Sequence, residues 1–197
     1  MVQIAVTGNM GCGKTLICKM MESEGVPVYY SDVHAKQLMN QNQSLMESIK
    51  ERFGKESYHD GMLNRKWIAS IVFDDAIALN DLNNLVHPVV QKNYLNWLSQ
   101  QTKDIVAYES AILIEHGNQG NFDVVILVQC PEKIRLERIQ KRDGLTLNEV
   151  QARTRFQWQE EEKIKYADYL IENIALEEAK QQFNSAISSI RKQLQKD

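Results

Sequence analysis

The stretch GNMGCGKT, residues 8–15, constrains this chain more than any other feature of its sequence. It matches the pattern G-x-x-x-x-G-K-[ST], with Gly8 first, Gly13 sixth, and Lys14 and Thr15 at the end. An apolar run of strand length precedes the motif, and a stretch with helical spacing follows it. A strand, this motif and a helix in that order predict a loop that binds phosphate groups.

Each residue type in the loop has a chemical reason to be there. Gly8, Gly11 and Gly13 allow backbone conformations that a side chain disfavours, so successive N–H groups can point toward an anion. The helix that begins near Lys14 adds the positive end of its dipole. We expect Lys14 to reach the β- and γ-phosphates of a nucleotide and the Thr15 hydroxyl to hold Mg²⁺. A glycine-rich turn without a ligand is the alternative, and it explains the combined pattern less well.

Short apolar runs alternate with longer helical patterns along the rest of the chain. Strand-length runs lie at 2–7, 26–30, 104–109, 123–129 and 168–172, and helical patterns lie at 14–24, 32–53, 65–73, 80–102, 131–142, 147–165 and 176–195. This alternation predicts an α/β fold with a parallel sheet and right-handed crossovers. The run TLNE (146–149) predicts a capping box at the start of a helix.

The composition is that of an ordinary globular domain. The chain has 197 residues, 43% of them apolar, and a net charge of −3, so we expect no nucleic-acid partner. No window approaches eighteen apolar residues, so we expect no membrane span. The three cysteines form no CxxC pair and the N-terminus does not resemble a signal peptide, which favours a cytoplasmic location.

Residues 54–100 depart from the simple alternation of strands and helices. A polar, loop-like stretch with two glycines opens this region, and a helical pattern follows. We interpret the region as a substrate-side subdomain. No guanine-reading N-K-x-D motif follows a later strand, so the sequence favours a small-molecule kinase over a GTPase.

Two arginines lie where a mobile lid is expected. Arg138 and Arg142 are four residues apart and share one helical face. Such a face can close over ATP and neutralise charge on the transferred group, and Gly144 is a candidate hinge. The alternative is a solvated charged face paired with nearby acids such as Glu137 and Asp143.

Asp32 is the candidate general base. It follows the strand at 26–30, at the carboxyl edge of the predicted sheet, where ligands of open α/β folds bind. There it could accept the proton of an attacking hydroxyl. The alternative, compatible with this role, is that Ser31 or Asp32 caps the next helix.

Two further polar residues are weaker candidates. Glu109 ends the strand at 104–109, where a carboxylate can support Mg²⁺ through a water molecule, and a plain loop-facing carboxylate is an equal alternative. His87 precedes Pro88, which biases its backbone toward extended geometry. A lone histidine is more often structural than functional.

With these residues in hand, the sequence resembles the dephospho-coenzyme A kinase family along nearly its whole length. The resemblance rests on an ordered set of segments: VTGNMGCGKT, GVPVYYSDVHAKQL, GMLNRKWIASIVFDD, LNNLVHPVV, LIEHGNQGNFDVVILV, RIQKRDGLTLNEVQARTRFQ and ADYLIEN. Outside the phosphate loop each segment is weakly specific, and the ordered set is specific.

The resemblance implies an ATP-dependent kinase that phosphorylates the 3′-hydroxyl of the ribose in dephospho-CoA, giving CoA and ADP. It implies a single domain with a five-stranded parallel core (about 1–31, 101–130 and 166–197), a helical CoA-side insertion (about 32–100) and a lid (about 131–165). The residues that it assigns are Asp32 as general base, Arg65 and His87 facing the CoA precursor, Arg138 and Arg142 in the lid, Asn173 near adenine, and Gly8, Gly11, Cys12, Gly13, Lys14, Thr15 and Leu16 around ATP and Mg²⁺.

Four positions depart from the family pattern. Asn9 stands where glycine is common, Leu16 replaces a second hydroxyl, Tyr30 replaces an acid, and Ala111 stands where proline is usual. These departures affect loop contacts and local backbone geometry, and they leave Lys14, Thr15 and Asp32 intact.

Two other functions compete with this interpretation. One is another small-molecule or nucleoside monophosphate kinase on the same fold, and the other is a P-loop module that binds nucleotide without turnover. We expect a monomer or a weak homo-oligomer.

Overall fold

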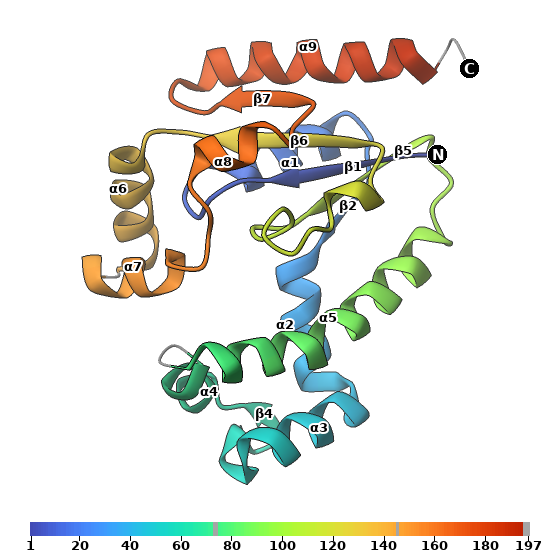
Figure 1. Cartoon of the computed structure of the whole chain (residues 1–197). Helices are drawn as coiled ribbons and strands as arrows, with labels where there is room; N and C mark the ends of the chain where they lie inside the picture. Colours follow the sequence, from blue (N-terminus) through green and yellow to red (C-terminus); the bar gives the residue numbers. More distant parts are fainter. Residues whose placement is uncertain (73–74, 145, 195–197) are drawn as a thin grey trace. The chain divides into compact units, whose positions relative to one another are not determined.

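A five-stranded sheet is the centre of the larger of two units in the computed structural model, which describes residues 1–72, 75–144 and 146–194. Its strands are β1 (Val2–Thr7), β2 (Val28–Tyr30), β5 (Ile105–Glu109), β6 (Val124–Gln129) and β7 (Tyr169–Glu172). Their order is β2-β5-β1-β6-β7, and β1 pairs in parallel with both β5 and β6 (Figure 1). The predicted α/β fold with a five-stranded parallel core is confirmed.

The central strands are buried on both faces, as their continuous apolar runs predict. In β1, Ile4, Ala5 and Val6 are fully buried, and β6 buries five consecutive residues. Strands of this kind occur where helices cover both faces of a parallel sheet. Because β1 lies between β5 and β6, the loop after β1 opens at the carboxyl edge where the connections diverge, the usual ligand site of such sheets.

The first unit also contains helices, some of which pack on the strands. They are α1 (Lys14–Ser23), α6 (Glu132–Asp143), α7 (Leu147–Thr154), α8 (Glu160–Ile164) and α9 (Leu176–Leu194), with a 3₁₀ turn η2 (Gln119–Asn121). Helix α1 contacts β1 and β5, α8 contacts β6, and α9 packs on β7 (Figure 1). The stripe that α9 buries, which includes Phe183, Ile187 and Ile190, has the spacing of one helix face.

The lid segment differs in part from its prediction. The capping box is confirmed, since the Thr146 side chain accepts from the Glu149 N–H and the Glu149 carboxylate accepts from the Thr146 N–H. The single helix predicted over 147–165 is wrong, because α7 and α8 are separated by residues 155–159. Gln157 and Trp158 in this break hydrogen-bond to the phosphate loop instead of continuing a helix.

The second unit, Tyr30–Gln100, is mainly helical. Its elements are α2 (Ser31–Gln41), α3 (Gln43–Phe53), η1 (Lys55–Ser57), β3 (Tyr58–His59), β4 (Met62–Leu63), α4 (Arg65–Val72) and α5 (Ala76–Leu98). The single helix predicted over 32–53 is wrong. Asn42 has an extended backbone that ends α2, and its side chain accepts a hydrogen bond from Leu45 N at 3.0 Å, which caps α3.

His87 does not take the extended geometry that the following proline favours. His87 and Pro88 both lie inside the continuous helix α5. The neighbouring Val86 and Val90 are buried, and α5 contacts α2, α3 and α4. Burial of this helix in the second unit outweighs the local preference of the residue before proline.

Within the described ranges, no helix is both long and apolar enough to cross a membrane. Phe73, part of one family-like segment, and Leu145 in the lid lie outside the described residues, as does the side chain of Arg153.

Candidate active site

The phosphate loop joins β1 to α1, and its glycines are required by the backbone. Gly8, Gly11 and Gly13 have φ angles of 141°, 84° and 100°, which L side chains rarely adopt. Space is also lacking: a Cβ on Gly8 would lie 2.0 Å from the carbonyl oxygen of Val128 in β6. The loop is therefore folded tightly against the sheet at the point where α1 begins.

Lys14 lies at the mouth of this loop. Its Nζ donates to the carbonyl oxygen of Gly8 at 2.9 Å and lies 3.8 Å from Oε1 of Glu109 at the end of β5. Both side chains are about nine-tenths buried (10% and 11% exposed), so the two charges compensate each other in a partly dehydrated setting. A flexible ammonium on a glycine-rich loop is the arrangement that binds the outer phosphates of a nucleotide.

Residues near the loop also suit Mg²⁺ that arrives with a nucleotide. No group of three or more histidine, cysteine or acidic side chains able to hold a metal occurs in the described part of the chain. The exposed Thr15 hydroxyl in the first turn of α1 and the buried carboxylate of Glu109 are oxygen donors of the kind that Mg²⁺ prefers. Mg²⁺ usually takes only one or two protein ligands besides phosphate oxygens and water, so these donors fit the ion.

Asn173 stabilises the loop by a hydrogen bond to its backbone. This side chain is 5% exposed, and its Nδ2 donates to the carbonyl oxygen of Cys12 at 2.8 Å. A Cβ on Gly13 would lie 1.9 Å from the same nitrogen, so Asn173 and the loop are closely fitted. The amide that the sequence predicts near adenine is thus directed at the loop backbone, and its contact with a nucleotide stays a prediction. Leu16 is half-buried in the first turn of α1.

Asp32 is exposed in the first turn of α2, two residues after β2. The N-cap residue of α2 is Tyr30, which makes no side-chain cap in the described structure, and both Ser31 and Asp32 lie within the helix. Capping therefore does not occupy the Asp32 carboxylate. Asp32 belongs to the second unit, and its role as general base stays a prediction.

The two arginines predicted for the lid make different contacts. Arg138 is half-buried, with its guanidinium 3.6 Å from Cys130 Sγ and 3.5 Å from the carbonyl oxygen of Ile174, next to Asn173. Arg142 is exposed and donates two hydrogen bonds of 2.8 Å to Asp143, which raise its pKa above the usual range. Arg138 thus lies near the loop support, whereas Arg142 is paired with an acid, as the alternative interpretation expects.

Comparison with known proteins identifies the family. The family model for dephospho-CoA kinase matches residues 2–178. A dephospho-CoA kinase of Bacteroides fragilis (strain YCH46) is 32% identical over 173 residues, which cover 87% of this chain and 84% of that relative. The chain belongs to the dephospho-CoA kinase family.

Solved structures are similar over nearly the whole chain. The protein TT1252 from Thermus thermophilus has a TM-score of 0.85 at 33% identity, over 98% of this chain and 97% of that chain. A dephospho-CoA kinase from Campylobacter jejuni has a TM-score of 0.69 at 28% identity, over 96% of this chain and 97% of that chain. The fold is therefore shared with these structures along nearly the whole chain.

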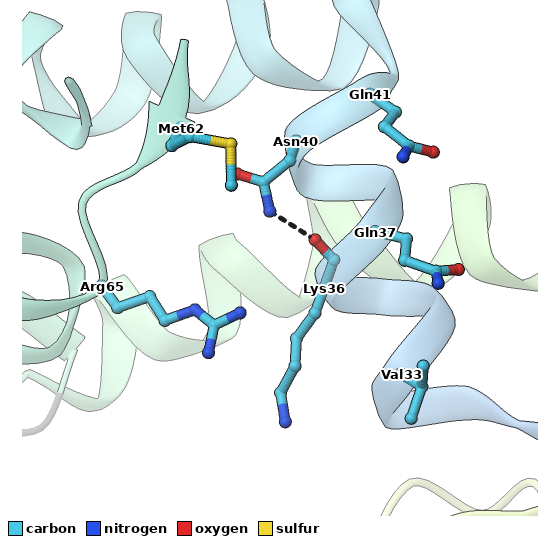
Figure 2. A pocket seen from close by; sticks show the side chains of 7 residues that line it. All are labelled: Val33, Lys36, Gln37, Asn40, Gln41, Met62 and Arg65. Atoms are coloured by element: carbon cyan, nitrogen blue, oxygen red, sulfur yellow. Dashed lines mark hydrogen bonds between the residues drawn. The ribbon is translucent and has the colours of Figure 1, made fainter. Parts of the chain in front are cut away.

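In this dephospho-CoA kinase family member the second unit contains a cavity of about 340 Å³. Its lining comes from α2, β4 and the start of α4: Val33, Lys36, Gln37, Asn40, Gln41, Met62 and Arg65. Figure 2 shows the Arg65 side chain extending toward α2, the helix that carries Lys36, and none of the described residues that line the cavity is acidic. The two cations, together with the apolar side chains that line the same cavity, suit a ligand that has both phosphate and alkyl groups.

His87, like Arg65, was predicted to face the CoA precursor, but the structure places it differently. It is half-buried within α5 and does not line the cavity. Its predicted role in binding the CoA precursor therefore gains no support from the cavity and stays a prediction.

A buried ion pair beside the loop was not predicted from the sequence. Lys163 in α8 is fully buried, and its Nζ lies 2.5 Å from Glu115 Oε1 and 2.6 Å from Asn9 Oδ1. Burial lowers the pKa of Lys163 below its usual value, and the hydrogen bond with Glu115 opposes that shift. The run EEEKIK around it is typical of a solvated helix face, so only the long-range contacts reveal its position.

Proposed function

We propose that this protein transfers the γ-phosphoryl group of ATP to the 3′-hydroxyl of the ribose in dephospho-CoA, giving CoA and ADP. The observation that carries the proposal is the glycine-dependent loop with Lys14 at its mouth, in a chain that aligns with the dephospho-CoA kinase family over residues 2–178. Phosphoryl transfer requires mainly positioning and stabilisation of charge, and the loop offers both.

The loop would hold the nucleotide. Its N–H groups and the N-terminus of α1 would bind the phosphates, and Lys14 would neutralise charge that develops on the transferred group. Thr15 directly, and Glu109 through a water molecule, would hold the Mg²⁺ that accompanies ATP. That ion supplies additional positive charge at the β- and γ-phosphates.

The second unit would hold the acceptor. Lys36 and Arg65 at the cavity in Figure 2 would bind the pyrophosphate of dephospho-CoA, and Met62 and Val33 would contact its apolar parts. Asp32 would accept the proton of the 3′-hydroxyl as its oxygen forms a bond to the γ-phosphorus. The bond between that phosphorus and the β–γ bridging oxygen breaks, and ADP leaves.

The remaining predicted residues would act around these two sites. Arg138 and Arg142 would stabilise charge on the γ-phosphate when the lid segment closes. Asn173 would keep the loop in shape and approach the adenine. The three buried free cysteines suit a reducing compartment, and we place the protein in the cytoplasm.

The decisive experiment measures ADP release with ATP and Mg²⁺ in the presence of dephospho-CoA, AMP, CMP or shikimate, with the Lys14→Ala variant as control. We expect acceptor-dependent ADP release only with dephospho-CoA, and CoA as the product by mass spectrometry. Turnover with another acceptor would retain the kinase and exclude this substrate. Tight ATP binding without any turnover would favour the nucleotide-binding module.

A further inference from the structure

Lys163 is a fully buried cation whose two partners lie far from it in the sequence. Its ammonium donates to Asn9 Oδ1 and pairs with Glu115, which is itself only 5% exposed at its side chain. A buried ammonium is strongly unfavourable unless a carboxylate and hydrogen-bond acceptors compensate it. The contact with Asn9 places this compensated charge directly on the phosphate loop.

The segment that carries Lys163 holds two consecutive residues of the loop. Asn9 Nδ2 donates to the carbonyl oxygen of Trp158 at 3.2 Å, and Met10 N donates to Gln157 Oε1 at 2.9 Å. Asn9 is only 3% exposed, so its amide is enclosed by these partners. The first half of the loop is therefore bound by side-chain and backbone groups of residues 157–163.

The same segment is fastened to the chain that follows β5. Gln157 Nε2 donates to the carbonyl oxygen of Ala111 at 3.0 Å, and Trp158 N donates to Glu115 Oε1 at 3.1 Å. The chain that follows β5 begins directly after Glu109, whose carboxylate lies 3.8 Å from Lys14 Nζ. Hydrogen bonds thus connect the phosphate loop, residues 157–163 and residues 111–115 in one network.

We propose that Lys163 is a positioning residue for phosphoryl transfer: neutralised by Glu115, it orients Asn9 and thereby the loop backbone on which Lys14 depends. Asn9 is close to Lys14 in the structure of the loop, because the Lys14 ammonium donates to the carbonyl oxygen of Gly8, and Gly8 directly precedes Asn9 in the chain. A shift of about 1 Å at such a group can reduce turnover roughly 10²-fold. This inference rests on the proposed kinase function.

The test is a double-mutant cycle on Asn9→Ala and Lys163→Met, with Lys165→Met as control, since Lys165 is an exposed lysine two residues after Lys163. ATP affinity is measured by calorimetry, and kcat and KM with dephospho-CoA for each protein. We expect each single variant to lower kcat about 10- to 100-fold and to weaken ATP binding, with little change in KM for the acceptor. The double variant should be no worse than Lys163→Met, since both act through one contact.

If the losses in kcat and ATP affinity of the two single variants multiply in the double variant, the proposal is wrong. It is also wrong if both single variants keep the ATP affinity and kcat of the wild type. If Lys163→Met does not fold, the pair Glu115→Gln with Lys163→Met removes both buried charges at once, which proteins often tolerate. That pair is expected to behave like Asn9→Ala. A wild-type protein that binds ATP but leaves dephospho-CoA unchanged would sink the proposed function, and the ATP-affinity cycle would still decide the positioning role.

Discussion

At the scale of single residues, the proposed chemistry depends most on Asp32. Its carboxylate is exposed and takes no part in capping α2. We predict that Asp32→Asn lowers kcat with dephospho-CoA by about 10²-fold, because the variant cannot accept the proton of the attacking hydroxyl. The dissociation constant for ATP should stay within about threefold of the wild-type value, as expected for a group that acts only on the acceptor.

The matched control is Asp60→Asn, which changes an exposed carboxylate in the turn between β3 and β4 of the same unit. Steady-state kinetics and ATP titration of both variants make the comparison. Equal kcat values for Asp32→Asn and wild type would remove Asp32 from the mechanism.

The three thiols are predicted to be unreactive in the folded protein. Burial raises the pKa of Cys12, Cys18 and Cys130, to about 11 for Cys130, above the ordinary value of 9.0. The native thiols therefore stay protonated where unfolded thiols ionise, so their contribution to stability is present below pH 9 and is lost as the pH rises through the raised pKa values.

Alkylation with iodoacetamide followed by mass spectrometry tests this point. We expect almost no labelling of the native protein at pH 7.5, only a weak increase at pH 9, and labelling of all three cysteines in urea. Rapid native labelling of Cys12, which lies within the phosphate loop, would show that the loop opens far more readily than its buried packing implies.

At the scale of elements, the phosphate loop combines two demands that only glycine meets at Gly8. Its φ of 141° disfavours a side chain, and a Cβ would lie 2.0 Å from a carbonyl oxygen of β6 that cannot move without disturbing the sheet. Gly25, after α1, also has a positive φ (77°), but nothing lies within 4 Å of its Cβ position. Substitutions at the two glycines therefore distinguish the cost of backbone strain, present at both positions, from the cost of steric overlap, present only at Gly8.

We predict that Gly25→Ala lowers the free energy of unfolding by about 1–2 kcal/mol, the cost of a left-handed backbone for alanine, and leaves ATP binding unchanged. Gly8→Ala should cost clearly more and should also abolish ATP binding. Urea denaturation and ATP titration measure both effects. A loss of stability no larger for Gly8→Ala than for Gly25→Ala would contradict the close approach of the loop to β6.

At the scale of the whole molecule, nucleotide binding should stabilise the fold. A ligand that binds only the native state adds about 2.7 kcal/mol at a concentration 100 times its dissociation constant. We predict an increase of this size for wild type with ATP and Mg²⁺, and little or none for Lys14→Ala at the same concentration, because the variant lacks the phosphate-binding ammonium. Each protein is compared with its own melting curve without nucleotide.

Lys19→Ala is the control for that measurement, since Lys19 is an exposed lysine on the same helix, α1. Its stabilisation by ATP should equal that of the wild type. A full increase in the Lys14→Ala variant would mean that ATP binds elsewhere or without this lysine.

The sequence by itself determined the features that depend on neighbouring residues. Glycine spacing, the following helix and the apolar run before it predicted the phosphate loop, and the alternation of strands and helices predicted the parallel sheet. The capping box at Thr146 and Glu149 was predictable for the same reason, because it is closed by residues three apart. The ordered family-like segments also predicted the family to which the chain belongs.

Only the tertiary structure decided the features that depend on residues distant in the chain. Lys163 lies 154 residues from Asn9 in the sequence, yet it is buried against the loop. Its sequence neighbours are charged and are typical of a solvated helix. The break between α7 and α8 and the inward direction of Asn173 also arise from contacts with this loop. Local patterns record backbone preference and periodicity, whereas burial of a charge depends on which partners the fold brings together.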